Sequence, residues 1–338
     1  MTGCEWGDLP GEVRDELRAK CGSIQRVISL PAGLTGGLAA RLDTPRGPVF
    51  VKSLPEDSPS APLYQRERLV GAVLPEGVPA PRMLWSGHTA GWIALLFEHV
   101  AMQREVDLGP ASPDLGDVMD IVRVLGEALT PNPGAEVPSV TDDVEFLRRR
   151  ADALLAAPPN DLQSLPTYQA ARAGLDWDAM SGDTLLHADL HEGNLLVSDR
   201  GVRLIDWGLA CQGAAWVETA LLIPRLILAG HTPEQAEALA EQVPAWRAAP
   251  ETAVTGLAAV WSLFREYVAR NGPERIRASR AHAAEAGRAW VEYRTSCPLE
   301  PQRIHAHRPT SSPGQPSHRR HITPTSAEYG EPASSQAR

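Results

Sequence analysis

Short apolar runs separated by turn residues fill the first hundred positions and predict β-strands. Expected strands cover residues 25–30, 38–42, 48–52, 79–85 and 92–97. Between the second and third of these runs, Asp43-Thr44-Pro45-Arg46-Gly47 has the composition of a turn. A short helix is expected over residues 63–73. This part of the chain therefore predicts a small β-rich unit.

After residue 101 apolar positions recur every three or four residues, which predicts helices. Ser112-Pro113-Asp114 predicts a helix start with Ser112 as N-cap, and Thr232 followed by Pro233 predicts another. Two long helices are expected over residues 252–270 and 274–294. The fold class is therefore α+β with two lobes.

The predicted organisation has three parts. A β-rich lobe covers residues 1–100, and a larger helical lobe, which holds one hairpin, covers residues 101–300. Residues 301–338 contain almost no large aliphatic side chains. Such a segment cannot bury enough apolar surface to offset the entropy of ordering, so it is predicted to be a disordered tail.

Charge excludes one class of partner. The 338 residues carry a formal net charge of -10, with 43% hydrophobic and 22% charged residues. Between residues 101 and 200 there are 18 acidic and 7 basic side chains. A protein that follows nucleic-acid phosphates needs the opposite balance, so no nucleic-acid partner is expected. The acidic stretch is consistent with a site for a cation or with a solvated surface.

Targeting signals and metal-binding cysteines are not expected. No apolar stretch is long enough to span a membrane, and the N-terminus has no signal-peptide pattern. The four cysteines are far apart and none forms a CxxC pair. These features predict a cytoplasmic protein.

Candidate chemistry is concentrated between residues 187 and 208. Residues 195–197 and 202–205 predict two strands joined by turn residues 198–201. With the turn centred on Arg200, the antiparallel register places Asn194 across from Asp206. One amide oxygen and one carboxylate would then converge, which suits Mg²⁺.

Asp189 precedes Asn194 by five residues, so it can accept a proton from a nucleophile while the other two groups hold the metal. Two other interpretations stay open. The segment is also consistent with an ordinary hairpin with polar ends. Alternatively, His187, Asp189 and His191 alternate as a strand would require for a metal-dependent hydrolase.

The spacing His187-x-Asp189-x-x-x-x-Asn194, followed by Ile205-Asp206-Trp207-Gly208, resembles the signature of the aminoglycoside phosphotransferase and choline kinase-like family. That resemblance, weaker outside the motif, extends over residues 25–294. It implies the two-lobed protein-kinase-like fold. It also implies Asp189 as catalytic base, Asn194 and Asp206 as Mg²⁺ ligands, and His187 as a support for the catalytic loop.

An enzyme of this kind needs a strand lysine on the ATP phosphates, paired with a helix glutamate. Lys52, one of only two lysines in the chain, and Glu67 fit these roles. The loop that contains Gly33, Thr35 and Gly36 would cover the phosphates. By the same resemblance, the backbone of Glu98 and Val100 would bind adenine.

The resulting hypothesis is an ATP- and Mg²⁺-dependent kinase that phosphorylates a hydroxyl of a small molecule. Acidic residues of the helical lobe suggest a cationic acceptor such as an aminoglycoside, another basic antibiotic or choline; they include Asp107, Asp114, Asp117, Asp120, Asp142, Asp143 and Glu145. A nucleotide-binding scaffold of the same fold is the alternative, although Lys52, Asp189 and Asp206 are all retained. Trp207 and the lack of an Ala-Pro-Glu segment argue against a protein kinase. Two positions depart from the family pattern, Thr130 and Glu218.

Overall fold

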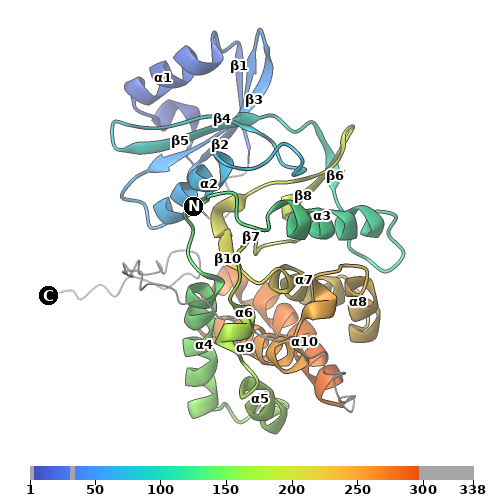
Figure 1. The fold of residues 1–338 in the computed structure, drawn as a ribbon. Helices are drawn as coiled ribbons and strands as arrows, with labels where there is room; N and C mark the ends of the chain where they lie inside the picture. The colour runs from blue at the N-terminus through green and yellow to red at the C-terminus, as the bar shows by residue number, and fades with distance from the viewer. Residues whose placement is uncertain (1–3, 31–34, 297–338) are drawn as a thin grey trace, which may run out of the picture.

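The computed structural model describes residues 4–30 and 35–296, which form a sheet lobe above a helical lobe (Figure 1). The sheet is antiparallel and its strand order is β1-β2-β3-β5-β4. Its strands are β1 (Arg26–Ser29), β2 (Leu38–Thr44), β3 (Gly47–Pro55), β4 (Met83–Thr89) and β5 (Trp92–Glu98). The predicted β-rich first part of the chain is thus confirmed.

One helix packs on each face of this sheet, and the two are α1 (Gly11–Cys21) and α2 (Ala61–Gly71). The interior strand β5 is therefore buried on both sides. Leu96 joins the cluster around Leu17 of α1, whereas Leu95 joins the cluster around Tyr64 of α2. This double burial explains why β5 is continuously apolar instead of alternating.

The connection between the lobes continues as a strand. β6 (Met102–Glu105) pairs with β8 (Leu195–Ser198), which pairs with β9 (Gly201–Leu204). The predicted change to helices after residue 101 overlooked this strand. All four residues of β6 are exposed, so no apolar alternation marks the strand in the sequence.

Eight helices of the described chain build the second lobe around one large core (Figure 1). They are α3 (Leu115–Ala128), α4 (Val140–Ala156), α5 (Leu165–Arg172), α6 (Trp177–Met180), α7 (Trp216–Leu228), α8 (Pro233–Ala240), α9 (Glu251–Asn271) and α10 (Glu274–Ser296). A two-stranded pair, β7 (Thr184–Leu186) and β10 (Cys211–Gly213), links the intervening segment, residues 187–210, to this core.

Of the two predicted helix starts, one is confirmed. Thr232 caps α8 and forms a capping box with Gln235. Ser112 is not the N-cap of α3, because the helix begins at Leu115 after Asp114. The Ser112 hydroxyl instead accepts a hydrogen bond from the Asp114 N–H, 3.1 Å away, in the loop before the helix.

None of the helices within residues 4–30 and 35–296 combines the length and hydrophobicity that a membrane crossing requires. The predicted disordered tail, residues 301–338, lies outside the described residues.

Candidate functional site

The hairpin forms, but its register differs by one residue from the prediction. Ser198 pairs with Gly201, whose φ of 86° closes a turn over the two residues between them. Asn194 consequently lies across from Ile205, whose N–H donates to the Asn194 carbonyl at 3.0 Å. The predicted pairing of Asn194 with Asp206 is wrong. Asp206 instead follows the strand in a left-handed conformation, with φ 65°, which turns the chain.

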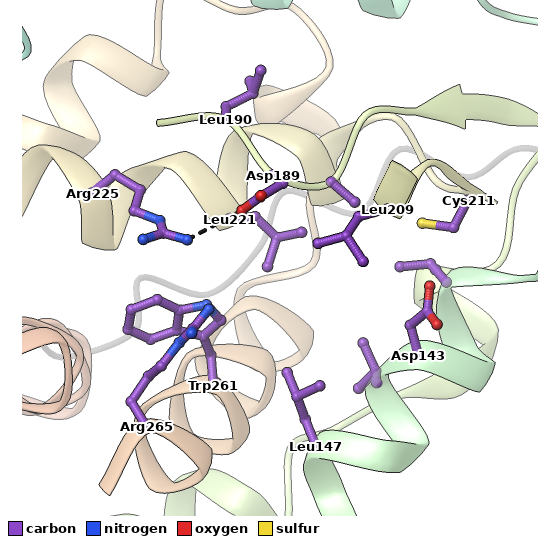
Figure 2. A pocket seen from close by; sticks show the side chains of 13 residues that line it. Asp143, Leu147, Asp189, Leu190, Leu209, Cys211, Leu221, Arg225, Trp261 and Arg265 are labelled. Carbon is purple, nitrogen blue, oxygen red and sulfur yellow. Dashed lines mark hydrogen bonds and ion pairs between the residues drawn. The ribbon is translucent and has the colours of Figure 1, made fainter. Parts of the chain in front are cut away.

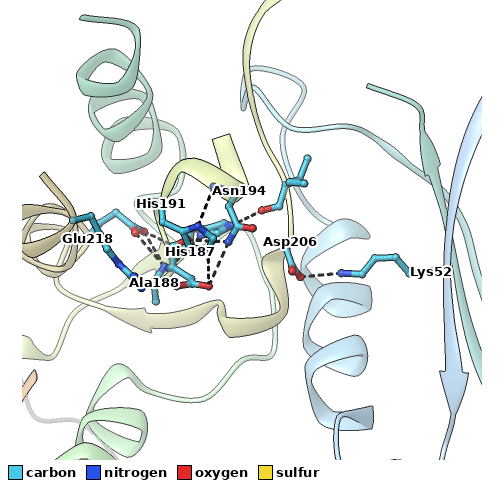
Figure 3. A network of polar contacts seen from close by, with 11 residues as sticks. Lys52, His187, Ala188, His191, Asn194, Asp206 and Glu218 are labelled. Carbon is cyan, nitrogen blue, oxygen red and sulfur yellow. Dashed lines mark hydrogen bonds and ion pairs between the residues drawn. The ribbon is translucent and has the colours of Figure 1, made fainter. Parts of the chain in front are cut away.

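Lys52 joins the two lobes at this turn (Figure 3). Its Nζ lies 2.6 Å from Glu67 Oε2 on α2 and 2.8 Å from Asp206 Oδ1. The predicted pairing of Lys52 on β3 with a glutamate on the next helix is therefore confirmed. The Lys52 side chain is 14% exposed, whereas that of Asp206 is 51% exposed.

Lys52, Glu67 and Asp206 influence one another's pKa values. Burial alone would lower the pKa of Lys52, but the Glu67 and Asp206 carboxylates outweigh burial and raise that pKa. The Lys52 charge in turn lowers the pKa of Asp206. Glu67 is more deeply buried, and burial raises its pKa despite Lys52. Asp206 therefore remains an exposed carboxylate beside a fixed cation.

His187 is fully buried and holds the segment before Asp189. Its Nε2 is 2.9 Å from the Ile205 carbonyl, and its Nδ1 is 3.3 Å from the Asp189 N–H. A neutral ring with its proton on Nε2 satisfies both contacts, and burial lowers the pKa of His187. The ring also packs edge-on against Trp207, with 4.8 Å between centroids.

Glu218 of α7 holds the same segment, a role that was not predicted for it. Its Oε2 accepts the His187 N–H at 2.5 Å and its Oε1 accepts the Ala188 N–H at 3.1 Å. Ala188 adopts a left-handed φ of 64°, so these bonds hold a backbone that alanine rarely adopts. Burial raises the pKa of Glu218 to about 7.

Asp189 faces three polar side chains. Asn194 Nδ2 lies 3.3 Å from Asp189 Oδ2 and 3.0 Å from the Asp189 carbonyl. His191 Nε2 is 3.5 Å from Oδ2, and an Arg225 amine is 3.3 Å from Oδ1. Burial by itself would raise the pKa of Asp189, but His191 and Arg225 outweigh it and lower that pKa.

Sequence reasoning missed Arg225. The residue interrupts the apolar run Leu221-Leu222-Ile223-Pro224-Arg225-Leu226-Ile227-Leu228 of α7. A cation within such a run is rarely buried without a polar partner, and this was the signal that could have found it.

The glycine-containing loop approaches Lys52 from the sheet. Gly36 has a left-handed φ of 71°. A Cβ on the neighbouring Gly37 would lie 2.7 Å from the Ser53 carbonyl and 2.8 Å from the Tyr64 hydroxyl, so only glycine fits there. The Tyr64 ring lies 5.2 Å from Lys52 Nζ, and its hydroxyl interacts with Thr35. Gly33, also predicted for this loop, lies outside the described residues.

Glu98 and Val100 lie in the connection between β5 and β6. The Glu98 N–H donates to the Arg82 carbonyl at 2.9 Å, and the Val100 carbonyl accepts the Met102 N–H at 2.8 Å. The Glu98 side chain forms an ion pair with Arg82 at 3.0 Å. Adenine binding by this connection stays a prediction.

The oxygen atoms of Asn194 and Asp206 fit a magnesium ion. The amide nitrogen of Asn194 donates hydrogen bonds to Asp189, which leaves the side-chain oxygen of Asn194 as a potential ligand. Asp206 contacts Lys52 through Oδ1 only, so its half-exposed carboxylate also presents Oδ2. Such a sparse, oxygen-only set is what Mg²⁺ uses beside phosphates.

The metal-hydrolase alternative finds no support. Both ring nitrogens of His187 contact backbone groups, so the ring has no nitrogen to offer to a metal. Within residues 4–30 and 35–296, no three His, Cys, Asp or Glu side chains are arranged to hold a metal ion.

A pocket opens beside Asp189 in the helical lobe (Figure 2). Its walls come from α4, α7, α9 and residues between 188 and 211. Aliphatic side chains form much of the lining, and these include Val144, Leu147, Leu209 and Leu221. Because Asp189 lies in the wall, a molecule in the pocket can reach the carboxylate.

Comparison with solved structures supports a kinase-like fold. Choline kinase LicA from Streptococcus pneumoniae has a TM-score of 0.57 at 16% identity, covering 81% of this chain and 97% of that one. A thermostable mutant of aminoglycoside phosphotransferase APH(4)-Ia gives 0.55 at 16% identity, with 82% and 98% covered. Spectinomycin phosphotransferase APH(9)-Ia, solved with ADP and spectinomycin, gives 0.53 at 12% identity, with 83% and 93% covered.

At these identities the structures establish the protein-kinase-like fold alone. No curated protein sequence matches the chain. A sequence profile of the phosphotransferase enzyme family matches residues 33–253, well over half of the chain. These residues include Lys52, the segment 187–210 and α7. The chain therefore belongs to the phosphotransferase enzyme family.

Proposed function

We propose that this protein is an ATP- and Mg²⁺-dependent phosphotransferase that phosphorylates a hydroxyl group of a small molecule. One observation carries the proposal. Asp189 lies in the wall of a pocket, and Asn194 links it to the turn where Lys52 meets Asp206. A hydroxyl bound in the pocket and a nucleotide bound at Lys52 would therefore both lie close to the Asp189 carboxylate.

The nucleotide would bind between the lobes. Lys52 would contact the phosphates, with Glu67 holding its ammonium in place. The loop at Thr35 and Gly36 would cover the phosphates from the sheet side, and the backbone of Glu98 and Val100 would hold adenine. Asn194 and Asp206 would hold Mg²⁺, which when bound would neutralise charge on the phosphates.

Asp189 would orient the acceptor and take its proton. Interaction with His191 and Arg225 keeps the carboxylate ionised at neutral pH. A weakly basic carboxylate suits phosphoryl transfer, because the loose transition state needs little proton removal before the P–O bond breaks. The acceptor oxygen would bond to the γ-phosphorus, ADP would leave, and the hydroxyl proton would pass to Asp189.

His187 and Glu218 would act through the backbone. His187 joins the Ile205 carbonyl to the Asp189 N–H, so it couples the segment before Asp206 to the segment that carries the base. Glu218 fixes the two preceding N–H groups. Both would keep Asp189 in position without touching the substrate, and such positioning is a large part of catalysis.

The test is ADP release by the purified full chain with ATP and Mg²⁺, against amino sugars, macrolides, choline and homoserine. Acceptor-dependent ADP release that Asp189→Asn abolishes supports the proposal. The melting temperature with ATP is measured in parallel. No stimulation above the Asp189→Asn control, together with no thermal shift by ATP, refutes it.

A further inference from the structure

The pocket beside Asp189 has an unusual distribution of charge for a lobe with so many acidic residues. Its wall contains two carboxylates, Asp143 and Asp189, and two guanidinium groups, Arg225 and Arg265. Figure 2 shows Arg225, Arg265 and Trp261 together at one end, Asp143 at the other, and leucines between them. This cationic end thus holds two guanidinium groups against one carboxylate, that of Asp189, which lies 3.3 Å from Arg225, and the middle of the pocket is aliphatic.

Neither carboxylate is available to bind a cationic substrate. Asp143 is held by Arg66 of α2, 3.0 Å away. Asp189 contacts Arg225, and the proposed reaction also requires it at the acceptor hydroxyl. A polycation would therefore enter a pocket in which each carboxylate already faces an arginine.

The remaining acidic side chains of this lobe do not line the pocket, and several are neutralised by neighbouring arginines. Asp114 pairs with Arg104, and Asp120 pairs with Arg123. Glu145 contacts both Arg148, at 2.6 Å, and Arg149, at 3.0 Å. Of the seven acidic residues that suggested a cationic acceptor, only Asp143 lines the pocket.

The cationic end is built from two helices. Arg225 comes from α7 with a side chain only 16% exposed. Arg265 comes from α9 and its guanidinium lies 4.8 Å from the Trp261 ring. A guanidinium held against an aromatic ring in a partly desolvated wall is well suited to bind a carboxylate through paired N–H groups.

From this charge distribution we propose that the acceptor is an alcohol with an apolar body and a carboxylate, not a polyamine or an aminoglycoside. The carboxylate would lie at Arg225 and Arg265, the body against the aliphatic wall, and the hydroxyl at Asp189. This inference rests on the proposed phosphotransferase function and specifies its substrate class.

Three probes of one shape test it: para-(hydroxymethyl)benzoate, its primary amide, and para-(hydroxymethyl)benzylamine. Each carries the same benzylic hydroxyl and ring, and the charges are negative, neutral and positive. Binding is measured by calorimetry on the full chain saturated with AMP-PNP and Mg²⁺. The benzoate should bind about tenfold or more tightly than the benzylamine, with the amide between them.

Variants assign the preference to the arginines. Arg265→Gln should bring benzoate affinity down to that of the amide and leave amide affinity unchanged. Arg225→Gln should lower benzoate affinity as well, but Arg225 also contacts Asp189, so the amide comparison is made with Arg265→Gln. Arg265→Lys, which retains the charge, should keep part of the preference. Arg123→Gln, which removes an exposed arginine of α3, serves as the matched control and should change nothing.

The outcomes separate the two proposals. Equal or tighter binding of the benzylamine, or no binding of any probe, overturns the substrate class. The wild-type comparison decides this even if Arg265→Gln fails to fold. Absence of AMP-PNP binding in the same calorimeter overturns the proposed function instead, since the nucleotide site does not include the arginine end of the pocket.

Discussion

Replacement of Glu218 tests most directly how the segment before Asp189 is held in place. Glu218 is 3% exposed, and its two carboxylate oxygens accept the N–H groups of His187 and Ala188. Glu218→Gln preserves the shape but offers one acceptor oxygen, so its NH₂ group would face one of the two N–H donors. The variant thus removes both a buried charge and one backbone contact.

The stability effect follows from the pKa of Glu218. Burial raises that pKa from 4.5 to about 7, so the folded protein binds this proton more tightly than the unfolded chain. The stabilising contribution of the protonated form is complete below pH 4.5 and is lost as pH rises through about 7. Since one pKa unit corresponds to about 1.4 kcal/mol, this shift contributes roughly 3 kcal/mol of pH-dependent stability.

Urea unfolding of wild type and Glu218→Gln from about pH 5 to about pH 8 measures this contribution, and other titrating groups cancel in the difference. Relative to wild type, the variant should become more stable by roughly 3 kcal/mol as pH rises. Glu127→Gln on the exposed face of α3 is the control for the exchange of a glutamate for glutamine away from the site. Parallel curves for wild type and Glu218→Gln would refute the buried-charge argument.

Activity gives the second measurement. Loss of a backbone contact at the left-handed Ala188 should shift Asp189, and a displacement of about 1 Å costs on the order of a hundredfold in rate. We expect kcat to fall while ATP affinity stays unchanged, because Glu218 is remote from Lys52 (Figure 3). Unchanged kcat would show that the Glu218 contacts do not position the base.

Asp189→Asn should lower acceptor-dependent ADP release by about a hundredfold or more and leave the ATP-induced thermal shift intact; a residual rate near wild type would contradict its role as base. Lys52→Met should abolish that thermal shift. It should also destabilise the fold by about 3 kcal/mol in urea, because it leaves Glu67 buried without its cation. Unaltered ATP binding by this variant would show that Lys52 does not contact the phosphates. A double-mutant cycle with Arg66→Gln and Asp143→Asn should give a coupling energy of about 1 kcal/mol for this bridge from α2 to α4, and strict additivity would mean that the ion pair contributes nothing. Removal of Mg²⁺ with a chelator should stop ADP release and added Mg²⁺ should restore it; full activity after chelation would show that Asn194 and Asp206 need no metal.

Local pattern, together with the family resemblance, predicted part of the site. Lys52 was identifiable as a lysine on a β-branched strand and Glu67 as a carboxylate on the next helix, and the two are in contact. The hairpin was visible because apolar runs flank turn residues. Its register was predicted one residue off, because turn geometry is set by the φ of Gly201, which composition does not reveal.

Other features were visible only once the chain had folded. Nothing near Glu218 or Arg225 in the sequence points to Asp189 or its loop, which lie some thirty residues earlier. β6 was missed because a fully exposed strand carries no apolar alternation. These elements owe their positions to contacts between distant segments.

The acidic composition illustrates the same division. Sequence alone established the charge of the helical lobe and predicted that the partner is not a nucleic acid. Tertiary structure decided where the charge lies: the Asp143 carboxylate is bound to Arg66 and the Glu145 carboxylate to Arg148, while Arg225 enters the pocket. Net charge is a sum over residues and is fixed by composition, whereas the field at a binding site depends on distances and pairing that only the fold determines.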